Sequence, residues 1–145
     1  MTDALFNELM SLDKCFTRPG KIKLPGQQER KVYDVKSSTT EDKFLFDYDR
    51  RGRFELKHKK QLRHGKDVCI IRLEINAPNH MNPDGNVLSR NHIHIYREGY
   101  DLSWAYELFD IFPNIPQELS ALNLFTIFCD YCKIDSTNIH LQGVL

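Results

Sequence analysis

Residues 72–104 read RLEINAPNHMNPDGNVLSRNHIHIYREGYDLSW, and this stretch decides how the middle of the chain is expected to fold. Apolar and polar residues alternate before and after the turn signal Asn82-Pro83-Asp84-Gly85, in which proline presets φ and glycine tolerates a positive φ. Alternation with a period of two is typical of β-strands, so the stretch predicts two antiparallel strands. The excursion over residues 77–90 is too long for a minimal hairpin loop. We expect it to form either a small hairpin of its own or a protruding functional loop.

The same pattern extends toward the N-terminus. Strands are expected at residues 31–35, 43–48, 53–62, 68–76 and 91–97, after a short extended segment at residues 21–24. Helices are expected at residues 3–16, with Thr2 as the N-cap, at residues 102–109, and from Pro116 along the apolar stripe that ends at Cys132. The sequence therefore predicts an α+β fold: an antiparallel five-stranded meander with N- and C-terminal helices packed on one face.

Length and composition favour a single α+β domain over residues 1–145. Hydrophobic residues make up 41% and charged residues 28% of the chain, which is ordinary for a globular protein. No apolar run approaches the roughly 20 residues needed to cross a bilayer, so we expect no membrane association. Four scattered cysteines point to a reducing, cytoplasmic location. The pair Cys129 and Cys132 falls late in an apolar helix, which favours buried structural thiols over a redox pair.

A net charge of zero hides an asymmetry along the chain. Residues 50–66 contain eight lysines and arginines and a single acid, whereas residues 98–145 contain seven acids and a single lysine. Such a split is typical of a face that binds a polyanion, or of two elements that attract each other. Both interpretations stay open at this point.

Strand parity brings the histidines together with part of this basic segment. If residues 68–76 and 91–97 pair, then Arg72, Glu74, Asn76, His92, His94 and Tyr96 share the face opposite the aliphatic side chains. Arg53, Glu55, Lys57 and Lys59 extend that face onto the preceding strand. One side of the sheet is thus expected to be a basic, histidine-bearing surface.

Three chemistries fit such a surface. Lysine and arginine could neutralise phosphates while Tyr96 or Tyr100 stacks on an unpaired base. Two histidines could cleave a phosphodiester by proton transfer, with Arg72 or Lys57 stabilising the developing charge. His92 and His94 could instead share a metal ion, completed by His80, Asp84 or Glu74. The structural alternatives are a solvated strand face and a hydrogen-bonded polar ladder across the hairpin.

Our choice among these is nucleic-acid binding, with RNA favoured, and no metal or cofactor. The residues expected to contact nucleic acid are Arg50, Arg51, Arg53, Lys57, Lys59 and Tyr96. For histidine-based cleavage, His92 and His94 are assigned to proton transfer, Arg72 to charge stabilisation, and His80 is held in reserve. No glycine-rich phosphate loop, nucleophile elbow or His-Glu-x-x-His helix is present, which argues against the common nucleotide-using and zinc-protease classes.

The segments from His80 to Gly85 and from His92 to Tyr100, followed by Trp104-Ala105, resemble the shared core of a family of uncharacterised small single-domain proteins from bacteria and prophages. The resemblance covers about the second half of the meander. It implies a toxin, a host-takeover factor or an inhibitor of a bacterial defence protein, and it transfers no catalytic residue. The rival function is therefore a non-enzymatic module that binds a bacterial protein.

Overall fold

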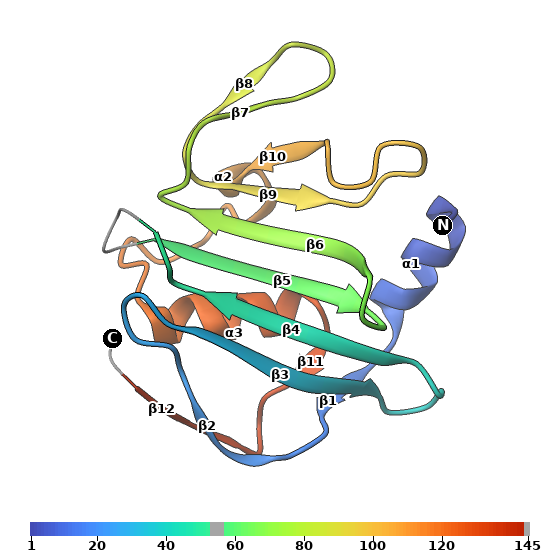
Figure 1. The fold of residues 1–145 in the computed structure, drawn as a ribbon, viewed down its shortest axis with the longest axis vertical. Helices are drawn as coiled ribbons and strands as arrows, with labels where there is room; N and C mark the ends of the chain where they lie inside the picture. The colour runs from blue at the N-terminus through green and yellow to red at the C-terminus, as the bar shows by residue number, and fades with distance from the viewer. Residues whose placement is uncertain (53–56, 144–145) are drawn as a thin grey trace.

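The computed structural model describes residues 1–52 and 57–143 and is built around one long sheet (Figure 1). Within these residues, eight strands pair in the order β10-β9-β6-β5-β4-β3-β1-β11. Neighbours are antiparallel except β1 and β11, which run parallel. The strands are β1 (Lys14–Phe16), β3 (Arg30–Ser37), β4 (Lys43–Asp49), β5 (His58–His64), β6 (Val68–Ile75), β9 (His92–Ile95), β10 (Ala105–Glu107) and β11 (Ile134–Asp135).

The predicted α+β class is confirmed, and the five predicted strands correspond to β3, β4, β5, β6 and β9. The predicted strand count is wrong, because β10 extends the sheet at one edge while β1 and β11 extend it at the other. Two of these additions come from segments predicted as helix. The first helix ends at Ser11, and Lys14–Phe16 pairs with β3 instead. Residues 105–107 pair with β9, which leaves a short helix α2 (Leu108–Ile111).

Two small two-stranded sheets flank the main one. β2 (Gly20–Lys23) pairs in parallel with β12 (Ile139–Gln142). β7 (His80–Met81) and β8 (Val87–Leu88) form a hairpin inside the excursion over residues 77–90, which is one of the two expected arrangements. Its turn is closed by a hydrogen bond from the Gly85 amide to the Asn82 carbonyl, and Gly85 has the positive φ of +89° that favours glycine.

The longest helix, α3 (Ala121–Tyr131), lies behind the central strands in Figure 1. It begins later than predicted, because the Ser120 hydroxyl accepts the Asn123 amide as the N-cap, and Pro116 stays outside the helix. Phe125 and Phe128 pack on Phe46 of β4, with ring centroids 5.3 and 4.8 Å apart. At the other end of the sheet, α1 (Asp3–Ser11) begins at the predicted Thr2 cap and adds Phe6 and Leu9 to the core.

Alternation along the strands gives the sheet two distinct sides. Phe46 faces α3, so residues of the same parity on β4 and their directly paired partners form the covered face. This face carries Phe44, Phe46 and Tyr48 of β4, His58, Lys60 and Leu62 of β5, and Ile71, Leu73 and Ile75 of β6. The opposite side, called the open face here, carries Asp47 and Asp49 of β4, Lys59 and Gln61 of β5, and Arg72 and Glu74 of β6.

None of the helices in the described part of the chain is long and apolar enough to cross a bilayer.

Candidate functional site

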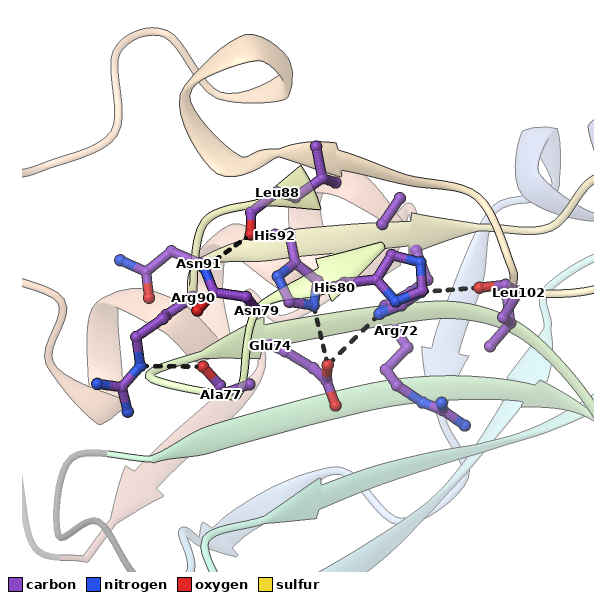
Figure 2. A network of polar contacts seen from close by, with 12 residues as sticks. Arg72, Glu74, Ala77, Asn79, His80, Leu88, Arg90, Asn91, His92 and Leu102 are labelled. Atoms are coloured by element: carbon purple, nitrogen blue, oxygen red, sulfur yellow. Dashed lines mark hydrogen bonds and ion pairs between the residues drawn. The ribbon is translucent and has the colours of Figure 1, made fainter. Parts of the chain in front are cut away.

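The site lies on the open face, where β6 and β9 pair. Glu74 lies directly opposite His92, and Arg72 lies opposite His94, so parity places all four side chains on one side as expected. They line a pocket of about 480 Å³. Figure 2 shows the Glu74 carboxylate joined by dashed lines to two imidazole rings, one of them that of His92. The remaining lining residues are Pro78, Asn79, His80, Leu102 and Ser103.

Each histidine of β9 has one ring nitrogen held by a backbone carbonyl. His92 Nδ1 donates to the Ser89 carbonyl at 2.7 Å, and His94 Nδ1 donates to the Leu102 carbonyl at 2.7 Å. Because a carbonyl oxygen can only accept, both Nδ1 atoms must carry a proton. The two Nε2 atoms therefore face inward, and both point at the same oxygen, Glu74 Oε2, at distances of 3.0 and 3.4 Å.

The contacts among Glu74, His92 and His94, called the histidine–carboxylate cluster, also shift the pKa values of Glu74 and His92. Burial would raise the pKa of Glu74, but hydrogen bonds with His92 and His94 outweigh that effect and hold its pKa well below the ordinary value. Burial would lower the pKa of His92, but its contacts with Glu74 and the Ser89 carbonyl reverse the direction and raise it. The cluster thus keeps an ionised carboxylate and favours positive charge beside it.

His80 reaches the same pocket from β7. Its Nε2 donates to the Ser103 carbonyl at 2.8 Å, and its ring centroid lies 4.6 Å from that of His94 and 5.7 Å from that of His92. The hairpin that carries it is held by Asn82, whose side-chain amide exchanges two 2.9 Å hydrogen bonds with the backbone of Ala105 on β10. All three histidines of the excursion and β9 therefore come together; strand parity predicts this for His92 and His94, and His80 is held only in reserve.

Arg72 lies beside the histidines at the pocket. Its Nε donates to Gln61 Oε1 at 3.2 Å, and this partner is a neutral amide. Among residues 1–52 and 57–143, Arg72 forms no ion pair. Its guanidinium is therefore a cation at the pocket wall whose charge is not cancelled by a paired carboxylate there.

The other cations named from the sequence are dispersed. The Arg50 side chain is buried, 3% exposed, and bonds the Pro25 carbonyl, so its predicted place on an open binding surface is wrong. Arg51 is exposed but binds Asp49 through both Nε and Nη2. Lys57 is half-buried in the loop before β5, and Lys59 lies on the open face between Asp49 and Glu74. Arg53 lies outside the described residues.

The acids that neutralise this basic segment come from β4. Asp47 accepts hydrogen bonds from Arg30 at 2.9 Å and from Arg63 at 2.7 Å, and Asp49 holds Arg51. Counting charges along residues 50–66 misses these partners, because both acids lie just outside that range and Asp47 reaches Arg63 only across the sheet. The open face is consequently mixed in sign, and Arg72 is the cation that lines the pocket.

Tyr96 does not lie on the open surface, and the prediction that it shares the face of His92 and His94 is wrong. Its ring is buried against Phe6 of α1, with centroids 5.8 Å apart, and its hydroxyl donates to the Met1 carbonyl. β9 ends at Ile95, so strand alternation no longer fixes the direction of residue 96. Tyr100, in the loop that leads to Leu102 and Ser103, is the exposed tyrosine.

Glu74 is the central residue that the predicted site set omits. Parity places it on the correct face and makes it a candidate metal ligand, but it is absent from the residues predicted to act there. The backbone carbonyls of Ser89 and Leu102 cannot be identified from sequence, because main-chain acceptors leave no signal in side-chain chemistry. The expected burial of Cys129 and Cys132 holds: both are free and fully buried, and burial raises the pKa of each thiol.

Fold and site together define an α+β protein with a long, mainly antiparallel sheet and a histidine–carboxylate pocket on its open face. The chain belongs to a family of unknown function, DUF6978, whose model matches residues 1–134. That range includes every residue that lines the pocket. No curated protein and no solved structure matches the chain.

Proposed function

We propose that the protein binds nucleic acid, with single-stranded RNA favoured, and that a backbone phosphate lies in the pocket beside Arg72. One observation carries this proposal: the Arg72 guanidinium lines an open pocket and has no carboxylate partner among the described residues. Phosphates are the usual anions bound by such guanidinium groups. A pocket of about 480 Å³ also falls within the size range of small-ligand sites, so it has room for a nucleotide unit.

Two further features support a single strand. Tyr100 is 47% exposed, and its loop leads directly into the pocket residues Leu102 and Ser103, so its ring can stack on an unpaired base. Lys59 lies on the same face one strand away, opposite Glu74. A strand bound at Arg72 could therefore place a base on Tyr100 and a neighbouring phosphate near Lys59.

The geometry does not favour cleavage by two histidines. In that mechanism one ring takes a proton and another delivers one on the far side of the reacting phosphorus. Here His92 and His94 both direct Nε2 at the same oxygen of Glu74. We therefore propose binding as the function of this face and do not assign His92 and His94 as a proton-transfer pair.

The test is a titration of fluorescent single-stranded RNA at several salt concentrations. Arg72→Gln is expected to weaken binding and to lower the slope of log affinity against log salt by about one, the loss of one phosphate contact. Arg18→Gln is the matched control, because Arg18 is exposed just after β1, which lies near the opposite edge of the sheet from β9. Equal affinities for the native chain and Arg72→Gln, or an affinity insensitive to salt, would contradict the proposal.

A second candidate is a non-enzymatic module that binds a protein. The specific observation is the cross-strand pair Met81 and Val87 on the β7–β8 hairpin, which is 65% and 61% exposed. In the bacterial or prophage setting that the sequence resemblance implies, such a module would act as an inhibitor of a host or defence protein, and an RNA-binding protein would act as a toxin. The free cysteines are compatible with the cytoplasm as its location.

Pull-down from a bacterial lysate, with and without nuclease, separates the two candidates. Recovered RNA that disappears with Arg72→Gln supports the first. A stoichiometric protein that survives nuclease and is lost with Met81→Ser supports the second.

A further inference from the structure

Three ligand-type atoms converge at the centre of the pocket. Glu74 offers a carboxylate oxygen, and His92 and His94 each offer Nε2, all within 4.8 Å of one another. Since both Nδ1 atoms donate to backbone carbonyls, a neutral ring presents the lone pair of Nε2 to the carboxylate. When both rings are neutral, three acceptors face one another, and a metal ion between them would take the place of the proton that otherwise links an imidazole to Glu74.

The spacing suits a metal ion in this role. Two ligands about 2.1 Å from a common ion lie about 3.0 Å apart in octahedral and about 3.4 Å apart in tetrahedral geometry. Glu74 Oε2 lies 3.0 Å from His92 Nε2 and 3.4 Å from His94 Nε2. The two Nε2 atoms lie within 4.8 Å of each other, so binding of an ion would draw the two rings closer together.

The hydrogen bonds around the two imidazoles are those typical of metal-binding histidines. Metal-binding histidines typically donate their second ring nitrogen to a carbonyl or carboxylate, which fixes the tautomer and the ring orientation. His92 and His94 both do so, at 2.7 Å each. Both rings are buried, whereas the Glu74 side chain is 19% exposed and lines the pocket, so further coordination positions can face the cavity.

We infer that Glu74, His92 and His94 bind a divalent first-row transition metal ion through three protein ligands, with the remaining positions open to the pocket. Two imidazoles and one carboxylate match the ligand preferences of zinc and of non-haem iron(II), and disfavour magnesium, which prefers oxygen ligands. The sequence predicts no metal, because its ligand pattern, His-x-His, is weakly specific. Glu74 at 3.0 Å and the two carbonyl-held tautomers are the additional observations.

A metal ion at this site would add a second phosphate-binding group to the proposed RNA-binding function, and this step depends on that proposed function. A metal with open positions can bind a phosphate oxygen, and Arg72 lines the same pocket. The ion and the guanidinium would then contact one phosphate group from two sides. Metal binding itself does not depend on RNA, so each proposal can fail separately.

Isothermal titration of the metal-free protein with zinc chloride, without RNA, is the test. The native chain is expected to bind one zinc ion, and His94→Ala to lower the affinity at least about 100-fold, because even outer partners of metal ligands cost 10- to 100-fold. Magnesium chloride is expected to give no binding at this site. His64→Ala is the matched control: His64 also contacts a carboxylate, Asp42 at 2.9 Å, but belongs to no cluster of three ligand-type side chains in the described part of the chain. Its zinc affinity should equal that of the native chain.

A second variant tests whether a loss of zinc binding could be due to a loss of folding. Glu74→Gln keeps the volume of the side chain and can still hydrogen-bond an imidazole, but it removes the charge. Circular dichroism should show an unchanged fold, while zinc should no longer raise the melting temperature as it does in the native chain. The inference is overturned if the native chain does not bind zinc, or if Glu74→Gln and His94→Ala bind it as tightly as the native chain.

Discussion

Buried histidines lie on both faces of the same sheet, two on the open face and one on the covered face in the described part of the chain. On the open face, His92 and His94 share Glu74, and the contacts with Glu74 and Ser89 raise the pKa of His92. On the covered face, His58 is equally buried, but its neighbours are the Tyr48 hydroxyl and the cations Lys60 and Arg50, and burial followed by these charges lowers its pKa to about 3. Burial alone therefore does not decide the state of a histidine here; the charge of its partner does.

The same contrast extends to the lysines of β5. Lys60 is completely buried on the covered face, its ammonium lies 3.6 Å from the centre of the Tyr48 ring, and burial lowers its pKa well below the ordinary value. Lys59, the adjacent residue, lies half-buried on the open face between Asp49 and Glu74. One face thus buries basic groups and lowers their pKa values, and the other places them beside acids nearer the surface.

The largest expected effect is on packing of the covered face. Phe46→Ala removes a fully buried ring between Phe125 and Phe128 and should cost about 3–5 kcal/mol of unfolding free energy. Val32→Ala is the matched substitution on an exposed side chain of β3 and should stay within about 0.5 kcal/mol. Urea denaturation at pH 7 measures both. Similar losses for the two variants would mean that α3 does not define the core.

The second effect is acid destabilisation through His58. Its folded-state pKa of about 3 lies below the ordinary 6.5, so its contribution is complete above pH 6.5 and is lost as the pH falls toward 3. At pH 5 the loss should be about 2 kcal/mol relative to neutral pH. The difference in urea stability between pH 7 and pH 5 measures it.

The control for that measurement is a pair of glutamine variants. His58→Gln should flatten the pH dependence, whereas His140→Gln, which removes an exposed histidine of β12, should leave it as in the native chain. Parallel curves for His58→Gln and the native chain would show that His58 is not held neutral in the folded state.

The smallest of the expected effects concerns the ion pairs of the open face. Burial would raise the pKa of Asp47, but hydrogen bonds from Arg63, Arg30 and Gln61 outweigh it and lower the pKa. Asp47→Asn should cost about 1–2 kcal/mol at pH 7, and that difference should shrink as the pH falls below the ordinary carboxyl pKa of about 4 and vanish below the lowered pKa of Asp47 in the folded protein. Asp34→Asn, at an exposed position of β3, should have no measurable effect in the same urea titration. A cost for Asp47→Asn that persists at low pH would indicate lost packing instead of lost charge pairing.

Much of this sheet could be predicted because strand periodicity is a local property of the sequence. Residues 68–76 and 91–97 alternate clearly enough for parity alone to place Arg72, Glu74, His92 and His94 on one face. β1 and β11 contain three and two residues, too few for a period to be visible, and they are held by pairing and by the buried side chains of Phe16 and Ile134. The segment around Trp104 has helical spacing, but Asn82 binds the backbone of Ala105 and holds it against the hairpin.

The site was predictable in part for the same reason. Parity brought the histidines and Arg72 together, but it could not follow Tyr96 beyond the end of β9 or recognise that Asp47 neutralises Arg63 across the sheet. Nor could it find the carbonyls of Ser89 and Leu102, which set the tautomers of both rings. The features that distinguish a cation site from a polar ladder are therefore three-dimensional ones.

The convergence of Glu74, His92 and His94 on a cation is most directly tested by anomalous X-ray diffraction at the zinc absorption edge, from crystals of the native chain grown with zinc. One strong peak is expected within bonding distance, about 2.0–2.2 Å, of Glu74 Oε2 and both Nε2 atoms. A map with no peak there, or with zinc only at surface histidines such as His64 or His140, would contradict the account.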